Sequence, residues 1–158
     1  MSFEALKRDS DKRWLDLTTG SKPWIRVSSA MCCGTSLESD SIVAEIVEYS
    51  NKNKTPINID TVGCHGICYA GPIIDILYKG QPRIFWGNVT KDNVIKILDS
   101  YIKNGEILTE NLLGSLGERS IEGIKKINDL PGMSLQNRIA LRNSGNIAFN
   151  DIYQYIAN

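Results

Sequence analysis

Two apolar runs joined by a short turn constrain the fold of this chain more than any other feature. Residues 73–78 are apolar apart from Asp75, residues 79–82 have the composition of a turn, and residues 84–86 after Arg83 are again apolar. This pattern predicts a β-hairpin whose first strand is buried on both faces of a sheet. A helix is predicted over residues 90–105, because Thr90 is a suitable N-cap and apolar side chains recur at helical spacing up to a terminal glycine.

Further strands and a helix are predicted ahead of the hairpin. Residues 24–27 alternate as a short strand and lead into a loop of small residues, 28–35. The next segment carries apolar side chains on one helical face at residues 43–47, and residues 57–61 indicate a second strand. The order strand, helix, strand, hairpin and helix is a thioredoxin-like arrangement. We therefore predict an α/β fold in which helices flank a mixed sheet.

The chain is predicted to have three parts. Residues 1–22 hold a charged segment with a few apolar residues, which suits a helical arm lying on a surface. Residues 23–105 form the thioredoxin-like domain. Residues 106–158 differ in character, because glycines loosen the chain and apolar residues then recur at helical spacing. We expect an all-helical C-terminal appendage, with short helices over residues 121–127, 135–142 and 147–156.

Composition argues against several classes of function. Lysine plus arginine and aspartate plus glutamate both number 18 among 158 residues, and no basic stripe suits a nucleic acid backbone. No apolar run approaches the roughly 20 residues of a membrane-spanning helix, and the N-terminus lacks the apolar centre of a secretory signal. We therefore expect a cytoplasmic protein without nucleic acid binding or membrane insertion. In that reducing compartment the four cysteines are better read as thiols, metal ligands or redox groups than as disulfides.

The cysteines form two pairs, each in a loop just after a predicted strand. Cys32 and Cys33 are adjacent, whereas Cys64 and Cys68 are separated by three residues. In a thioredoxin-like fold both loops lie at the same end of the sheet, so the pairs can converge. Four thiolates are the usual ligands of a [2Fe–2S] cluster, and a tetrahedral zinc site could use the same cysteines with His65.

The loop around Cys64 favours iron–sulfur over zinc. Its two glycines, Gly63 and Gly66, let the backbone approach a sulfur atom closely and donate hydrogen bonds to it. Adjacent residues rarely direct both side chains at one cluster, so either Cys32 or Cys33 is expected to be a spectator. Residue spacing alone leaves open cysteines buried without a cofactor, a zinc site and a thiol–disulfide pair.

Three stretches together resemble one family. Residues 62–74 (VGCHGICYAGPII) resemble the second cluster half of the thioredoxin-like [2Fe–2S] ferredoxin domain that is fused to NADH-binding flavoprotein subunits. Residues 82–90 (PRIFWGNVT) are similar to the hairpin and helix start of that fused form. Residues 136–145 (QNRIALRNSG), with residues 151–157 after them, resemble its helical connector to the flavin domain. Such subunits belong to NADH dehydrogenases, NAD(P)-reducing hydrogenases and formate dehydrogenases.

The resemblance implies a ligand set with one departure from the family pattern. Family members with a full cluster carry Cys-x4-Cys after the first strand, and Ser28 and Cys33 occupy those two positions here. The implied ligands are therefore Cys33, Cys64 and Cys68. Cys32 or Ser28 would have to supply the fourth.

The resemblance also implies a function within a larger assembly. We expect an electron-transfer or docking domain of an NADH-linked oxidoreductase, whose partner is a flavin- and NADH-binding domain or subunit. The chain has no Gly-x-Gly-x-x-Gly after a strand, so it should bind neither flavin nor NADH and should not be catalytic alone. Without its partner it should self-associate or have a mobile tail. The alternatives are a cluster-free structural module for subunit interaction and a zinc-stabilised binding domain.

Overall fold

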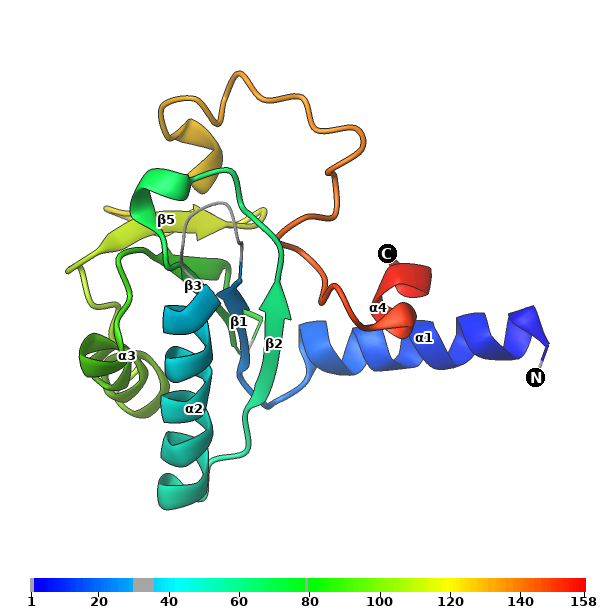
Figure 1. Ribbon diagram of the computed structural model, residues 1–158, viewed down its shortest axis with the longest axis horizontal. Coiled ribbons are helices and arrows are strands. Elements are labelled where there is room, and N and C mark those ends of the chain that lie inside the picture. Colours follow the sequence, from blue (N-terminus) through cyan, green and yellow to red (C-terminus); the bar gives the residue numbers. More distant parts are fainter. Residues whose placement is uncertain (1, 30–35, 79) are drawn as a thin grey trace.

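The computed structural model describes residues 2–29, 36–78 and 80–158. One five-stranded sheet organises these residues, in the order β2-β1-β3-β4-β5 (Figure 1). The strands are β1 (Trp24–Ser28), β2 (Asn58–Val62), β3 (Ile74–Leu77), β4 (Arg83–Trp86) and β5 (Leu112–Leu116). β1 pairs with β2 in parallel, and the remaining neighbours are antiparallel. The predicted mixed sheet and the predicted hairpin are therefore confirmed.

Two helices cover one face of the sheet. They are α2 (Ser36–Asn53), which connects the parallel strands β1 and β2, and α3 (Lys91–Leu98), which follows the hairpin. Alternate residues of the strands, such as Ile25, Ile76 and Trp86, point into the core between sheet and helices. α3 begins at Thr90 as predicted, because the Thr90 and Asn93 side chains form a reciprocal capping box. A π-helical segment, Asp99–Lys103, continues it.

Residues 106–158 form the C-terminal tail, and much of this tail lies over the opposite face of the sheet. Arg26, Asp75 and Arg83 lie on this face, and the backbone of residues 145 and 146 accepts hydrogen bonds from the two arginines. The tail contains β5, a short 3-10 helix (Ile127–Asp129) and α4 (Ile152–Ala157). Much of this face of the sheet is therefore covered by irregular backbone instead of by a helix.

The prediction of an all-helical appendage is wrong. Residues 112–116 form β5 because the free edge of β4 offers unpaired backbone groups, and Leu112 packs against the main core. The helix predicted over residues 135–142 is absent, since turns occupy this segment and its polar groups bond to the body of the molecule. Of the other two predicted helices, only the 3-10 helix at 127–129 and α4 remain.

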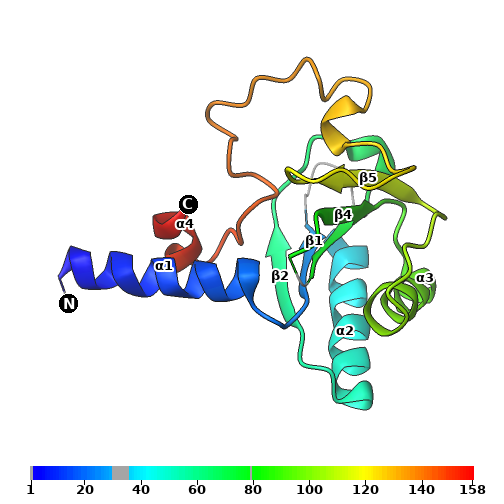
Figure 2. The same cartoon turned by 180° about the vertical axis from the view of Figure 1, so that it is seen from behind.

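The N-terminal arm and the C-terminus lie side by side. α1 (Phe3–Thr19) extends away from the sheet, and α4 packs against it (Figures 1 and 2). The Arg13 guanidinium stacks 3.7 Å from the ring centroid of Tyr153, and Trp14 meets Trp24 of β1 edge to face. Within the described residues, no helix combines the length and apolar character that crossing a membrane requires.

Candidate metal centre

Parallel pairing of β1 and β2 brings the carboxyl ends of the two strands together at one end of the sheet. The strands end in register, with Ser28 opposite Val62, and the Ser29 N–H donates to the Val62 carbonyl at 2.9 Å. The loop after β2 holds Cys64 and runs into a single 3-10 turn, Cys68–Ala70. Sequence-distant segments that follow the two strands therefore start beside each other, as the order of elements predicts.

Cys64 and Cys68 form a pair of sulfur atoms near the surface. Their Sγ atoms are 3.7 Å apart, and the Gly66 N–H donates to Cys64 Sγ at 3.1 Å. Two sulfurs bound to one tetrahedral metal at the usual Zn–S length of ~2.3 Å would be ~3.8 Å apart. The pair therefore has the spacing of two ligands on one metal ion, a spacing that a weak S–H···S contact also fits.

Cys33 and Cys32 lie outside the described residues, so their role as ligands stays a prediction. Within the described ranges, no group of three or more histidine, cysteine or acidic side chains could hold a metal. The Cys64–Cys68 pair could supply two ligands of a tetrahedral site. Any further cysteine ligand would come from the other pair.

Ser28, the alternative fourth ligand, already has a hydrogen-bonding role. Its side chain is buried, and its hydroxyl oxygen accepts a hydrogen bond from the Ile73 N–H at 2.9 Å. Its carbonyl accepts a hydrogen bond from the Ser39 hydroxyl at 2.6 Å. Ser28 thereby ties the end of β1 to both α2 and the segment that leads into β3.

His65 faces away from the cysteine pair, into the molecule. Its ring lies against Gly145 and meets Phe85 edge to face at 5.4 Å. Its Nε2 atom is 3.7 Å from Asp75 Oδ2. Burial lowers the pKa of His65 to about 4, so the imidazole is neutral at physiological pH. These contacts make His65 a packed loop residue in this structure.

A network of charged side chains lies in the interior, near the loop that holds Cys64 and Cys68. The sequence analysis did not predict this network. Asp75 is fully buried and faces two guanidiniums: Arg26 Nε at 2.8 Å and Arg83 Nη2 at 2.9 Å. Burial would raise the pKa of Asp75, but the two cations hold it below its ordinary value. The signal in the sequence was one charged residue in each of three mostly apolar strands, namely Arg26, Asp75 and Arg83.

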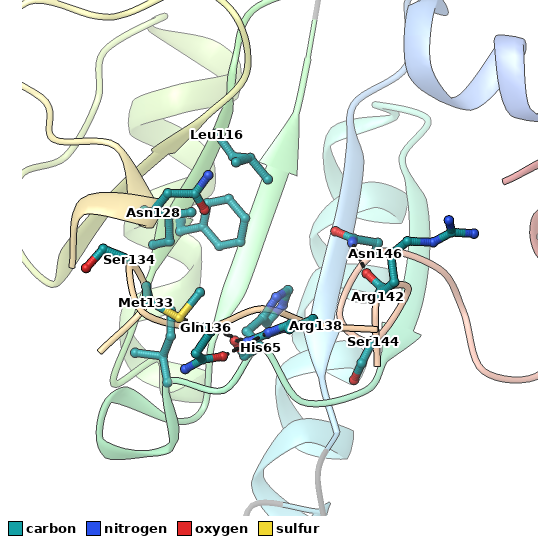
Figure 3. A pocket seen from close by; sticks show the side chains of 13 residues that line it. His65, Leu116, Asn128, Met133, Ser134, Gln136, Arg138, Arg142, Ser144 and Asn146 are labelled. Atoms are coloured by element: carbon teal, nitrogen blue, oxygen red, sulfur yellow. Dashed lines mark hydrogen bonds between the residues drawn. The ribbon is translucent and has the colours of Figure 1, made fainter. Parts of the chain in front are cut away.

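Residues 136–146 contact the backbone of the loop that holds Cys64 and Cys68. Ser144 Oγ donates to the Cys64 carbonyl at 2.9 Å, and the Arg138 guanidinium donates to the His65 carbonyl. The Arg83 side chain fixes this segment, with Nη1 2.8 Å from Asn146 Oδ1. A cavity of about 350 Å³ remains between the segment and the body, and Figure 3 shows Gln136 and Arg138 beside His65 among the residues that line it.

Comparison with known proteins gives one curated relative. No family model matches the chain. A "Ferredoxin, 2Fe-2S" of Clostridium pasteurianum is 40% identical over 52 residues, which make up 33% of this chain and 48% of the relative. The chain therefore spans about half the length of the curated relative that it matches.

Solved structures show the same arrangement of strands and helices. A thioredoxin-like [2Fe–2S] ferredoxin from Aquifex aeolicus superposes with a TM-score of 0.52 at 17% identity, covering 60% of this chain and 93% of that one. A cysteine-to-serine variant of the ferredoxin gives 0.50 at 16% identity, covering 58% and 97%. The chain therefore has the thioredoxin-like fold that these [2Fe–2S] ferredoxins adopt.

Proposed function

We propose that this chain is an electron-transfer domain that carries a [2Fe–2S] cluster on Cys33, Cys64 and Cys68. The observation that carries the proposal is the Cys64–Cys68 pair, with sulfurs 3.7 Å apart and a backbone N–H directed at one of them. A bound cluster of this type supplies one-electron chemistry, with a potential that hydrogen bonds to sulfur and solvent exposure adjust. The 40% identity to a [2Fe–2S] ferredoxin supports this choice of metal group.

Cys32 is the better candidate for the fourth ligand, against the expectation from the sequence that one of the two adjacent cysteines is a spectator. The Ser28 oxygen accepts the Ile73 N–H within the buried end of β1, so a bond to metal would disturb an existing contact. A thiolate is also the usual fourth ligand of such a cluster. The proposal therefore predicts that Ser28→Ala binds a cluster and that Cys32→Ser binds less.

We further propose that the domain serves an NADH-linked oxidoreductase, in which a separate domain holds the flavin and NADH. The chain would take one electron at a time from a reduced flavin and pass it to a one-electron acceptor. The resemblance of residues 82–90 and 136–157 to the fused form supports this context. Leu135 and Ile139, which are 89% and 83% exposed on the tail, support a partner surface there.

Anaerobic reconstitution with ferrous iron and sulfide tests the function. The expected product is brown, with equal amounts of iron and acid-labile sulfide and with charge-transfer absorption in the visible range. Cys64→Ser and Cys68→Ser should each lose most of this absorption, whereas Ser28→Ala should keep it. A colourless wild-type chain after reconstitution would overturn the proposal. Elemental analysis that finds zinc in its place would favour a zinc-stabilised domain.

A further inference from the structure

A single peptide unit connects Arg138 to the sulfur of Cys64. The carbonyl of the His65–Gly66 peptide accepts a hydrogen bond from the Arg138 guanidinium, and the N–H of the same peptide donates to Cys64 Sγ at 3.1 Å. Arg138 is held in this position by Gln136, whose Oε1 accepts from Arg138 Nε at 2.9 Å. Cation, amide and sulfur thus form one chain of hydrogen bonds.

The backbone at Gly66 is built for this arrangement. Gly66 has φ +78°, a backbone conformation that residues with a side chain rarely adopt. An added Cβ at this position would collide with the Arg138 guanidinium. Glycine therefore permits both the conformation of the loop and the approach of the cation. A glycine here serves the contact with Arg138 as well as the bend between the two cysteines.

A cation at the carbonyl strengthens the N–H of the same amide as a donor. Hydrogen bonds in a chain polarise one another, and a charged partner makes the effect larger than a neutral one does. A stronger N–H donor stabilises negative charge on the sulfur. Because reduction adds an electron to the metal–sulfur centre, this donor favours the reduced form and raises the reduction potential.

We propose that Arg138 is a positioning residue that raises the reduction potential of the cluster by acting through the His65–Gly66 peptide on Cys64. The inference rests on the proposed function, since it requires that Cys64 binds the cluster. Arg138 touches neither sulfur, and its effect passes through the polarised amide. The tail segment that carries Arg138 therefore helps to set how readily the domain accepts an electron.

Arg142 provides a matched control for Arg138. It lies in the same segment and carries the same charge, and its exposed side chain is directed away from His65 (Figure 3). Among the contacts of the described residues, none involves its guanidinium. Arg138→Met and Arg142→Met remove the same charge from the segment, but only Arg138→Met removes the cation from the peptide.

The test is a spectroelectrochemical titration of the reconstituted wild type and variants. Arg138→Met should decrease the equilibrium constant for one-electron reduction about tenfold, a shift of ~59 mV to lower potential. Arg142→Met should leave the potential close to that of wild type, and Arg138→Lys should restore most of the loss. Equal shifts in Arg138→Met and Arg142→Met, or no shift in either, would overturn the inference.

Two other outcomes are also decisive. If Arg138→Met binds no cluster, Arg138→Gln keeps a donor without the charge and is compared in the same titration. Loss of the cluster from both variants, while Arg142→Met keeps it, would show a purely structural role and overturn the inference. If the wild type itself binds no cluster, the proposed function fails, and that result is distinct from a failure of the inference.

Discussion

Replacing Asp75 by asparagine should destabilise the fold by roughly 3–5 kcal/mol, the usual cost of breaking a buried ion pair by removing one partner. Asp75 is completely buried and Arg26 is only 2% exposed, so water cannot replace the lost carboxylate. The variant would leave the buried Arg26 guanidinium and the 12% exposed Arg83 guanidinium facing a neutral amide. Domains of this kind are stable by about 5–15 kcal/mol, so the loss is a large fraction of the total.

The contacts of Asp75 with two arginines place the expected loss of stability near the upper end of the range of roughly 3–5 kcal/mol. Its Oδ1 atom accepts from Arg26 Nε at 2.8 Å and from Arg83 Nε at 3.0 Å, and Oδ2 accepts from Arg83 Nη2 at 2.9 Å. Asparagine has one oxygen and cannot satisfy all three donors. Arg83 also anchors the tail at Asn146, so the damage should extend to that segment.

Urea unfolding followed by circular dichroism measures the loss, with Asp11→Asn as the control. Asp11 pairs with Lys7 on the surface of α1, where both side chains are about half exposed. Such a pair is worth about 0.5 kcal/mol or less, so the control should unfold close to wild type. An Asp75→Asn variant that unfolds at the same urea concentration as Asp11→Asn would refute the argument that the network stabilises the tail-covered face.

Two further predictions concern Gly66 and Asp75, and a third concerns nucleotide binding. Gly66→Ala should cost more stability than Gly80→Ala, because both glycines have positive φ but only a Cβ at Gly66 would displace the Arg138 guanidinium from the His65 carbonyl. Thermal unfolding compares the two variants, and equal losses would contradict the reasoning. Below pH 3.8, the ordinary pKa of Asp75, the wild type should lose stability more steeply than Asp75→Asn. The reason is that a carboxylate with a lowered pKa stabilises the fold only while it is ionised. Equal slopes of the free energy of unfolding against pH in acid would contradict this. The chain alone should bind neither NADH nor flavin mononucleotide in calorimetry, because its sequence has no phosphate-binding glycine motif after a strand. Micromolar binding of either compound would contradict this prediction.

Local patterns in the sequence predicted the body of the fold. The apolar runs around Ile74 and Ile84 and the cap at Thr90 are governed by neighbouring residues, so periodicity and capping rules were sufficient to find β3, β4 and α3. The loop with Cys64 and Cys68 was recognisable because two cysteines at short spacing are also a local feature.

Long-range contacts explain what the sequence did not predict. β5 exists because the edge of β4 was free, and Gly114 in its middle weakens any strand pattern. The pairing of Asp75 with Arg26 joins strands that are 49 residues apart in the chain. Arg138 reaches back 73 residues to the His65 carbonyl, and nothing in its own segment indicates that partner.

Low-temperature electron paramagnetic resonance of the dithionite-reduced, reconstituted chain measures whether the protein holds a [2Fe–2S] cluster. We expect the signal of a reduced [2Fe–2S] cluster, with an integrated intensity that matches the iron content. Cys64→Ser and Cys68→Ser should lose or strongly alter that signal, because each removes a ligand of the pair whose sulfurs are 3.7 Å apart. A wild-type chain that is folded and reconstituted under the same conditions but gives no such signal and holds no stoichiometric iron would contradict the account.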